Sequence, residues 1–319
     1  MDNNFFLQIA LAKGIGDAAI KRALDFFSEN ADASWELLCS DLSMQILIFK
    51  NKQEIIDSIA LQKETAQRIA DGLERNGVKI VFFNDETYPN KLKLSLGTKC
   101  PPFLFYKGNF DLINKSSVGF CGSRNASLKG NTIARDCASQ LANCDVVVIS
   151  GYAKGVDMAA HKAALMNSGE TIFVLAEGIL TSTRKKDVRD WLTSENHLFI
   201  SQFLPEMDWH AGNAMKRNSV IIGLSDAMIL VESGEAGGTF AAGNETLSLN
   251  HPLFVIDFAQ PEVSAKANPF FISKGGIPIK GKNGMPNLKD VYAIIKDRRN
   301  NQVDYQHYDS GQLKLSIGL

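Results

Sequence analysis

Short apolar runs alternate with helix-like segments between Ser117 and Lys296, and this alternation constrains the fold more than any other feature of the chain. Residues 145–161, DVVVISGYAKGVDMAAH, show the unit most clearly: a β-branched run, a glycine-bearing turn and an amphipathic segment. A β-branched run bounded by polar residues is typical of a strand that is buried on both faces. Strands that alternate with helices predict a mostly parallel sheet with helices on both sides. We therefore expect an α/β fold with a doubly wound sheet.

The remaining elements follow from the same patterns. Residues 1–75 are expected to be helical, and a boundary near Asn76 divides the chain into a helical domain (1–75), a sheet domain (76–300) and a polar tail (301–319). Within 76–117 we expect a strand at 78–84 and then an extended, proline-marked stretch. The expected helices of the first part lie at 4–12, from Asp17 onward, and at 34–38, 41–50, 52–60 and 61–75. The expected strands of the sheet domain lie at 118–122, 145–150, 171–178, 198–201, 227–232, 253–257 and 277–280, and its helices at 129–143, 156–167, 213–224, 239–249 and 288–296.

Composition narrows the class of protein. The net charge of −1 means that any nucleic-acid binding must use a local basic patch. No apolar run approaches the ~18 residues of a membrane span, and the acidic N-terminus lacks the basic start of a secretory signal, so we expect a cytoplasmic protein with no membrane contact. The five cysteines show no C-x-x-C spacing, which favours free thiols in a reducing compartment. No metal-ligand or catalytic motif is found, so we expect no cofactor, no metal and no catalytic residue.

The first helical segment contains a possible nucleic-acid contact. Residues 11–16, LAKGIG, resemble a helix-hairpin-helix, a motif that offers backbone N–H groups to a phosphate. A plain turn between two helices, with a glycine stop, is the alternative interpretation.

Four expected strand ends carry unusual residues, and ligands of parallel sheets bind at such carboxyl ends. These ends are residues 122–124, 150–155, 176–178 and 232–239. The second and fourth are glycine loops that each lead into a helix N-terminus, with Thr239 as the expected N-cap of the fourth. Two such helix N-termini beside an arginine at one sheet edge indicate an anion site rather than coincidental turns.

Several side chains at this edge have candidate roles. Arg124 is suited to clamp a phosphate, or alternatively pairs with a surface carboxylate. Asp157 and His161 are four residues apart on one helix, so we expect them to pair and fasten the loop. Glu232 and Glu177 are placed for acid–base work only if a nucleotide lies between them. The expected phosphate-binding residues are Gly122, Ser123, Arg124, Ser150, Gly151, Lys154, Gly155, Lys216, Arg217, Asn218, Gly237, Gly238, Thr239 and Lys274, and the expected orienting residues are Asp157, His161 and Glu232.

Several motifs together resemble the DprA/Smf family over residues 76–282. Gly122-Ser123-Arg124, residues 150–161 (SGYAKGVDMAAH), 216–225 (KRNSVIIGLS) and the 232–239 loop occur in the order seen in that family, and residues 273–276 resemble its late glycine pair. The resemblance implies a Rossmann-like domain that follows a helical SAM-like domain. It also implies a non-enzymatic, homodimeric protein that binds single-stranded DNA and hands the strand to a RecA-like recombinase, typically in natural transformation.

The chain departs from the family pattern at several positions. Lys154 replaces the usual arginine of S-G-x-A-R-G-I-D, and Ser219 replaces the second arginine of R-N-R. Residues 237–239 (GGT) replace S-G-S and are closer to the related nucleotide-binding LOG group. The family's C-terminal winged helix is not evident. These differences favour a divergent member, with a role in a mobile element or in phage defence.

Two other functions stay open at the level of the sequence. One is a nucleotide-binding sensor or a nucleotide-processing enzyme, which the GGT loop favours. The other is a protein-interaction regulator such as an antitoxin. In the DNA-binding interpretation, Tyr152 and Phe240 are candidates for stacking on bases, although both are also suited to pack inside the fold.

Overall fold

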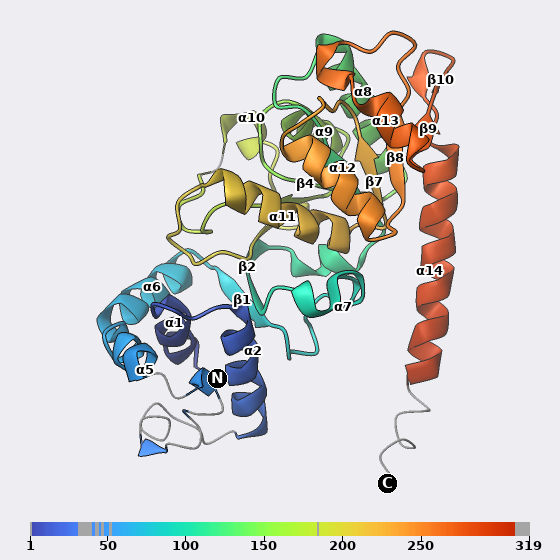
Figure 1. The fold of residues 1–319 in the computed structure, drawn as a ribbon. Coiled ribbons are helices and arrows are strands. Elements are labelled where there is room, and N and C mark those ends of the chain that lie inside the picture. The colour runs from blue at the N-terminus through green and yellow to red at the C-terminus, as the bar shows by residue number, and fades with distance from the viewer. Residues whose placement is uncertain are drawn as a thin grey trace.

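A single large sheet organises the fold (Figure 1). The structure is a computed structural model that describes residues 2–30, 40–41, 45, 48–50, 53–183 and 185–309. In this part of the chain the sheet has nine strands in the order β1-β2-β6-β5-β4-β3-β7-β8-β9. Their bounds are β1 (Lys79–Phe82), β2 (Phe103–Gly108), β3 (Ser117–Cys121), β4 (Val147–Ser150), β5 (Thr171–Val174), β6 (His197–Ser201), β7 (Ala227–Leu230), β8 (Leu253–Ile256) and β9 (Ile277–Ile279).

The strands from β6 to β9 in this order are all parallel, which confirms the expected mostly parallel sheet. β1 and β2 extend it at one side through antiparallel pairs, β1 with β2 and β2 with β6. The expected extended stretch before β2 is partly wrong, because α7 (Asn90–Leu96) forms there. Leu92 and Leu96 of α7 are buried, so tertiary packing stabilises a helix that the nearby prolines obscured in the sequence.

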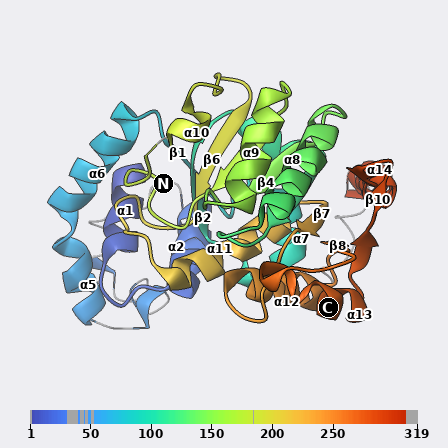
Figure 2. The same cartoon turned by 90° about the horizontal axis from the view of Figure 1, so that it is seen from above.

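Helices cover both faces of the sheet, as Figure 2 shows from above. α8 (Leu128–Ala142) and α9 (Val156–Met166) lie on one face, and α11 (Ala211–Leu224) and α12 (Gly238–Ser248) lie on the other. Strand β4 shows why both faces need cover. Val148 packs into the apolar cluster under α8 and α9, whereas Val147 and Ile149 pack into the cluster under α11 and α12. Side chains of a strand alternate between faces, so a continuous β-branched run is buried on both.

The helices before β1 pack partly on each other and partly on the sheet. They are α1 (Asn3–Leu11), α2 (Asp17–Glu29), α5 (Gln53–Ala60) and α6 (Lys63–Arg75). One apolar cluster, with Phe5, Ile9, Phe27 and Ile59, lies among these helices, and a second joins them to β2, β5 and β6. The expected helix at 34–38 lies outside the described residues, as does half of the one at 41–50. The division into domains stays a prediction.

Three further helices complete the chain: α10 (Lys186–Arg189), α13 (Asn268–Ser273) and α14 (Lys289–Asp309). The first two were not expected, and α14 is longer than the expected 288–296. It packs against the sheet face that α8 and α9 cover through Val291 and Ile295, and in Figure 1 it continues as a long helix at the side of the molecule. Within the described residues, none of the helices has the length and apolar character needed to span a bilayer.

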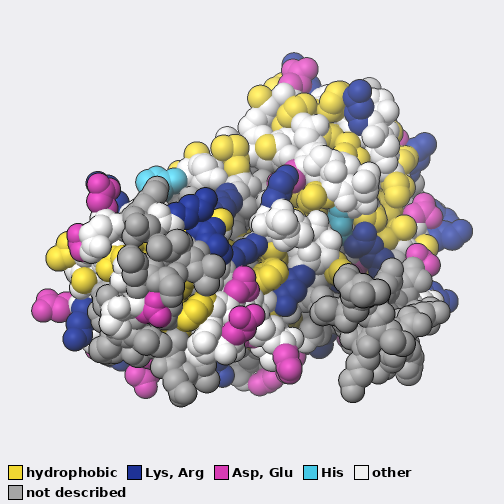
Figure 3. Space-filling model, turned by 60° about the horizontal axis from the view of Figure 1, so that its bottom comes forward, with side chains coloured by type: hydrophobic (Ala, Val, Ile, Leu, Met, Phe, Trp, Pro, Cys, Tyr) yellow, Lys and Arg dark blue, Asp and Glu magenta, His cyan; other side chains and the backbone are white. Residues whose placement is uncertain are grey.

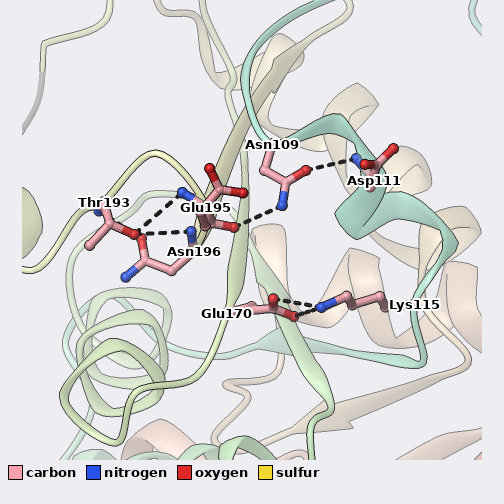
Figure 4. Close-up of polar contacts among 7 residues, drawn as sticks. All are labelled: Asn109, Asp111, Lys115, Glu170, Thr193, Glu195 and Asn196. Carbon is pink, nitrogen blue, oxygen red and sulfur yellow. Dashed lines mark hydrogen bonds and ion pairs between the residues drawn. The ribbon is translucent and has the colours of Figure 1, made fainter.

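Polar contacts link residues at the amino edge of the parallel strands (Figure 4). Lys115 Nζ, just before β3, forms an ion pair of 2.6 Å with Glu170 Oε1, just before β5. Asn109 Nδ2 donates to the Glu195 carbonyl at 2.9 Å and Asn109 Oδ1 accepts from Asp111 N. The ion pair neutralises the charges of Lys115 and Glu170.

Candidate anion-binding site

The carboxyl edge of the sheet is hollowed where the strand order reverses. From β3 the chain continues to β4, β5 and β6 on one side, and then crosses to β7 on the other side of β3. Such a switch point leaves a crevice between the loops that leave in opposite directions. The crevice here, called the switch-point cleft below, has a volume of about 560 Å³. It is lined by eight of the expected phosphate-binding residues: Gly122, Ser123, Arg124, Arg217, Asn218, Gly237, Gly238 and Thr239.

A second hollow adjoins this cleft at the ends of β4 and β5. We call it the side hollow; its volume is about 390 Å³, and Gly151 and Lys154 line it. Arg124, Trp209 and Arg217 line both spaces and so form the boundary between them. Most of the expected site residues therefore lie together, and they extend over both adjoining hollows.

Two of the loops pack against each other so closely that glycine is required. Gly155 has φ 75° and precedes α9, and a Cβ at this position would lie 2.3 Å from the Ser123 carbonyl oxygen. A Cβ on Gly122 would lie 2.4 Å from Val156. Val156 N donates to the Ser123 carbonyl at 3.3 Å. Glycine at 155 thus supplies both the left-handed backbone and the space for the loop after β3.

Glu232 fastens the loop after β3 to the end of β7. Its carboxylate is buried and accepts from Ser127 N at 2.8 Å and from Ser127 Oγ at 2.5 Å. Its carbonyl accepts from Ser123 N at 2.9 Å. Ser127 is the N-cap of α8 and also accepts from Gly130 N, so the carboxylate lies at a helix N-terminus, where negative charge is stabilised. With both oxygens bonded in this way, Glu232 is placed as an orienting residue.

Arg217 is the most unusual side chain of the site. It is 6% exposed, and its guanidinium lies directly over Gly151, where a Cβ would be 1.4 Å from Nη1. Its Nε has no hydrogen-bond partner among the described residues. Burial lowers the pKa of Arg217, and the carboxylate of Asp157 opposes that shift. A buried cation without hydrogen-bond partners is unfavourable, so a bound anion would stabilise it.

Arg124 and Lys185 extend the positive charge outward. Arg124 is exposed, its Cζ lies 5.1 Å from the centroid of the Trp209 ring, and within the described part of the chain it forms no hydrogen bond or ion pair. Lys185 lines the side hollow, donates to the Tyr152 carbonyl and lies 4.3 Å from the centroid of the Tyr152 ring. Burial lowers the pKa of Lys185, and the nearby Glu177 counteracts this. No motif in the sequence indicates Lys185 or Trp209, although the basic run at 184–186 is a signal for Lys185.

Basic side chains form local groups on one face of the molecule. Figure 3 shows one face, on which Lys and Arg side chains cluster left of the centre and at the right edge, between apolar and acidic areas. This distribution fits a chain with a net charge of −1. Among the described residues there is no group of three or more His, Cys, Asp or Glu side chains that could hold a metal ion.

Four of the expected phosphate-binding residues line neither hollow: Ser150, Gly155, Lys216 and Lys274. Lys216 forms an ion pair of 2.9 Å with Asp17 of α2 and so points toward the N-terminal helices. Lys274, at the end of α13, lies 5.8 Å from the centroid of the Phe270 ring and lines neither hollow. Ser150 is buried, and its Oγ donates to the Phe120 carbonyl at 2.9 Å, which joins β4 to β3.

The expected N-cap of the second glycine loop is also wrong. α12 begins at Gly238, and its N-cap is Gly237 with φ 91°. Thr239 lies in the first turn and lines the switch-point cleft. Asn218 links α11 to the start of α12, since its Nδ2 donates to the Gly238 carbonyl at 3.3 Å.

The expected pair of Asp157 with His161 is not formed. His161 Nδ1 lies 2.6 Å from Thr171 Oγ1, and the Thr171 hydroxyl donates to the Val148 carbonyl, so Nδ1 carries the hydrogen. Complete burial lowers the pKa of His161 to about 3, and the charge of Arg217 acts in the same direction. Asp157 Oδ2 instead accepts from Ala153 N at 3.3 Å in the first glycine loop. Both residues hold the site in place, but through different partners.

Of the two expected base-stacking aromatics, Tyr152 is buried in the fold and Phe240 is half-buried against its neighbours. Tyr152 is 7% exposed, and its ring contacts Phe173 and Phe199 with centroids 5.0 and 5.6 Å away. Phe240 stacks on Phe270 at 5.5 Å. The helix-hairpin-helix segment forms a turn between α1 and α2 in which Gly14 has φ 87°; its contact with nucleic acid stays a prediction.

Comparison with known proteins places this chain in a family. A family model described as DNA recombination-mediator protein A matches residues 79–283. The chain is 30% identical over 252 residues to the DNA processing protein DprA of Streptococcus pneumoniae, covering 76% of this chain and 83% of the relative. It is 27% identical over 258 residues to the protein Smf of Escherichia coli, covering 75% and 68%.

Two solved structures share the fold. The X-ray structure of DNA processing protein A from Streptococcus pneumoniae gives a TM-score of 0.73 at 23% identity, covering 88% of this chain and 95% of that one. A structure of DNA processing protein A from Helicobacter pylori, described as giving insight into its single-stranded DNA binding mode, gives 0.56 at 18% identity, covering 70% and 97%.

Proposed function

Because this chain belongs to the DNA recombination-mediator protein A family, we propose that it binds single-stranded DNA along the carboxyl edge of its sheet and acts in DNA processing or recombination. Arg217, a buried guanidinium whose Nε has no hydrogen-bond partner among the described residues, lies at the boundary of two open hollows and is the observation that carries this proposal. The related protein from Helicobacter pylori is described by its single-stranded DNA binding mode.

The strand backbone lies across both hollows in this proposal. Arg217 and Arg124, at the boundary, each bind a phosphate through N–H groups that no described residue occupies, and Lys154 and Lys185 bind further along the side hollow. Backbone N–H groups at the starts of α9 and α12 add anion contacts. Such contacts read the sugar–phosphate chain and not the base sequence, and they weaken with salt.

The wider biological role follows from the family resemblance. We propose a cytoplasmic homodimer that hands the strand to a RecA-like recombinase, and we propose the domain division at Asn76. The replacements at Lys154, Ser219 and residues 237–239 support a divergent role, in a mobile element or in phage defence, within the same kind of DNA processing.

A second candidate function has one supporting observation. Gly237 and Gly238 lead into α12 inside a cleft of about 560 Å³, a size that suits a single nucleotide. In this alternative the chain is a nucleotide-binding sensor. The engagement of Glu232 with Ser127 speaks against its use as a base in a nucleotide-processing enzyme.

A salt series with a labelled oligo-dT strand tests the proposal. The logarithm of the affinity falls with the logarithm of salt concentration by about 0.7 for each phosphate bound on a single strand, so the four cations predict a slope of about −2.8. Arg124→Ala should weaken binding and reduce the magnitude of the slope by about 0.7. Arg75→Ala is the control, because Arg75 is exposed at the end of α6 and lines neither hollow.

Two outcomes separate the candidates. Binding with a slope that Arg124→Ala leaves unchanged would contradict the assigned contacts. No oligonucleotide binding, together with thermal stabilisation by a mononucleotide, would refute the DNA-binding proposal and favour the sensor.

A further inference from the structure

Trp209 is an exposed aromatic side chain at the boundary of the two hollows. It lies in the segment between β6 and α11 and is 45% exposed, an unusually large fraction for an indole. It lines both the switch-point cleft and the side hollow. The other aromatic side chains of the hollows, Phe120 and Tyr152, are 0% and 7% exposed. Among the described residues, Trp209 is therefore the aromatic ring of the site that a ligand can reach.

Arg124 covers part of this ring. Its guanidinium carbon lies 5.1 Å from the ring centroid, a cation–π contact that orients both planar groups. Within the described part of the chain, neither the indole N–H nor the guanidinium takes part in a hydrogen bond. The pair thus presents a flat surface with free N–H groups at its edge.

We propose that Trp209 and Arg124 form a platform on which one base of the bound strand stacks. Bases of single strands stack on aromatic rings and on arginine planes without sequence preference. In a duplex the bases are already stacked on each other, so the platform favours single strands. The boundary position puts the stacked base between the phosphates held in the two hollows. This inference rests on the proposed DNA binding and adds to it the residue that recognises the base.

Substitution of Trp209 tests the platform. A stacked base is worth ~1–3 kcal/mol by alanine substitution, so Trp209→Ala should weaken oligo-dT binding roughly 5- to 150-fold. Trp209→Phe keeps an aromatic ring and should keep most of the affinity. Trp191→Ala is the matched control, since Trp191 is 43% exposed and lines neither hollow, and it should bind like the wild type.

Two further readouts distinguish stacking from a general disturbance of the loop. Trp209→Ala should leave the salt slope unchanged, because the indole contacts no phosphate. A strand of the same length without bases should bind wild type and Trp209→Ala equally, because the base that the platform recognises is missing from both complexes.

The outcomes separate this inference from the proposal on which it rests. If Arg124→Ala weakens binding but Trp209→Ala binds like Trp191→Ala, the platform is refuted and DNA binding at the edge stands. If Trp209→Ala and Trp209→Phe lose equal affinity, or if the base-free strand still separates wild type from Trp209→Ala, stacking is also refuted. If the wild type binds no oligonucleotide, the underlying proposal itself fails.

Discussion

Gly151 and Arg217 form a steric pair whose energy can be measured. A Cβ on Gly151 would lie 1.4 Å from Arg217 Nη1 and 2.1 Å from Cζ, whereas ordinary contacts begin near 3.4 Å, so Gly151→Ala must move the guanidinium by about 2 Å. Gly151 does not have a positive φ, so its backbone accepts alanine. Overpacking in a core costs about 1–3 kcal/mol of unfolding free energy, and the cost here should be near the lower limit, about 1 kcal/mol, because the displaced atoms are the end of an arginine side chain beside two hollows.

A double-mutant cycle assigns that cost to the pair. The three nearest atoms to the added Cβ all belong to Arg217, so Gly151→Ala should cost little when Arg217 is already alanine. Urea unfolding followed by circular dichroism gives the four free energies, and the coupling should equal the cost of Gly151→Ala alone. Oligo-dT affinity should fall in Gly151→Ala, because the displaced guanidinium no longer faces both hollows.

Gly212 supplies the control for the glycine substitution. It lies in α11, like Arg217, and a Cβ there would meet nothing within 4 Å. Gly212→Ala should therefore be neutral or stabilise the protein by up to about 1 kcal/mol. An equal loss of stability for Gly151→Ala in both backgrounds would refute the packing of Arg217 over Gly151.

Two more predictions concern the framework of the site. Burial lowers the pKa of His161 to about 3, so the unfolded chain binds a proton at this histidine more readily than the folded protein does. The unfolding free energy should therefore fall as the pH drops from about 6.5 toward 3, by at most about 1.4 kcal/mol per pH unit. His161→Gln should flatten this dependence in urea unfolding at pH 7, 6, 5 and 4; a variant as pH-sensitive as the wild type would contradict it. Asn268 is buried, accepts from Ser233 N and donates to the Val231 and Ile256 carbonyls, so Asn268→Ala should cost about 2–4 kcal/mol in the same assay. Asn244→Ala, on the exposed side of α12, should cost less than about 1 kcal/mol, and equal losses for the two asparagines would argue against this anchoring role.

The parallel sheet could be predicted because its signals are local. Each β-branched run is a buried strand, and each glycine loop after such a run lies at the carboxyl edge, so Arg124, Arg217 and the two glycine loops were expected together. The family resemblance, which used the same loops, is confirmed.

The corrected residues have partners that no spacing in the sequence reveals. Lys216 has the right position on α11, but its charge is taken by Asp17, 199 residues earlier in the chain. His161 is one turn from Asp157, yet its hydrogen bond is to Thr171 on the neighbouring strand. Thr239 is a good N-cap type, but Gly237, two residues earlier, is the N-cap and the helix begins at Gly238. In each case a contact or backbone conformation set by the tertiary fold replaced the one that residue spacing or residue type predicts.

Trp209 could not be predicted as a site residue because it belongs to no periodic pattern or motif in the sequence. It lies in an irregular segment before α11, and only the fold brings it beside Arg124, which is far from it in the chain. Of the aromatics that the sequence suggests, Tyr152 is buried against Phe173 and Phe199, and Phe240 is half-buried and stacks on Phe270.

The hydrogen bonds of Glu232 have a consequence for the speed of binding. Its carboxylate and carbonyl hold Ser127 and Ser123, while Asn268 holds Ser233, so the loops on both sides of the cleft form one body before any strand arrives. No loop closure then has to precede capture. Association should be set by diffusion and by electrostatic attraction alone, with an observed rate that rises linearly with strand concentration and reaches no plateau. Differences between variants would then appear mainly in how long the strand stays bound.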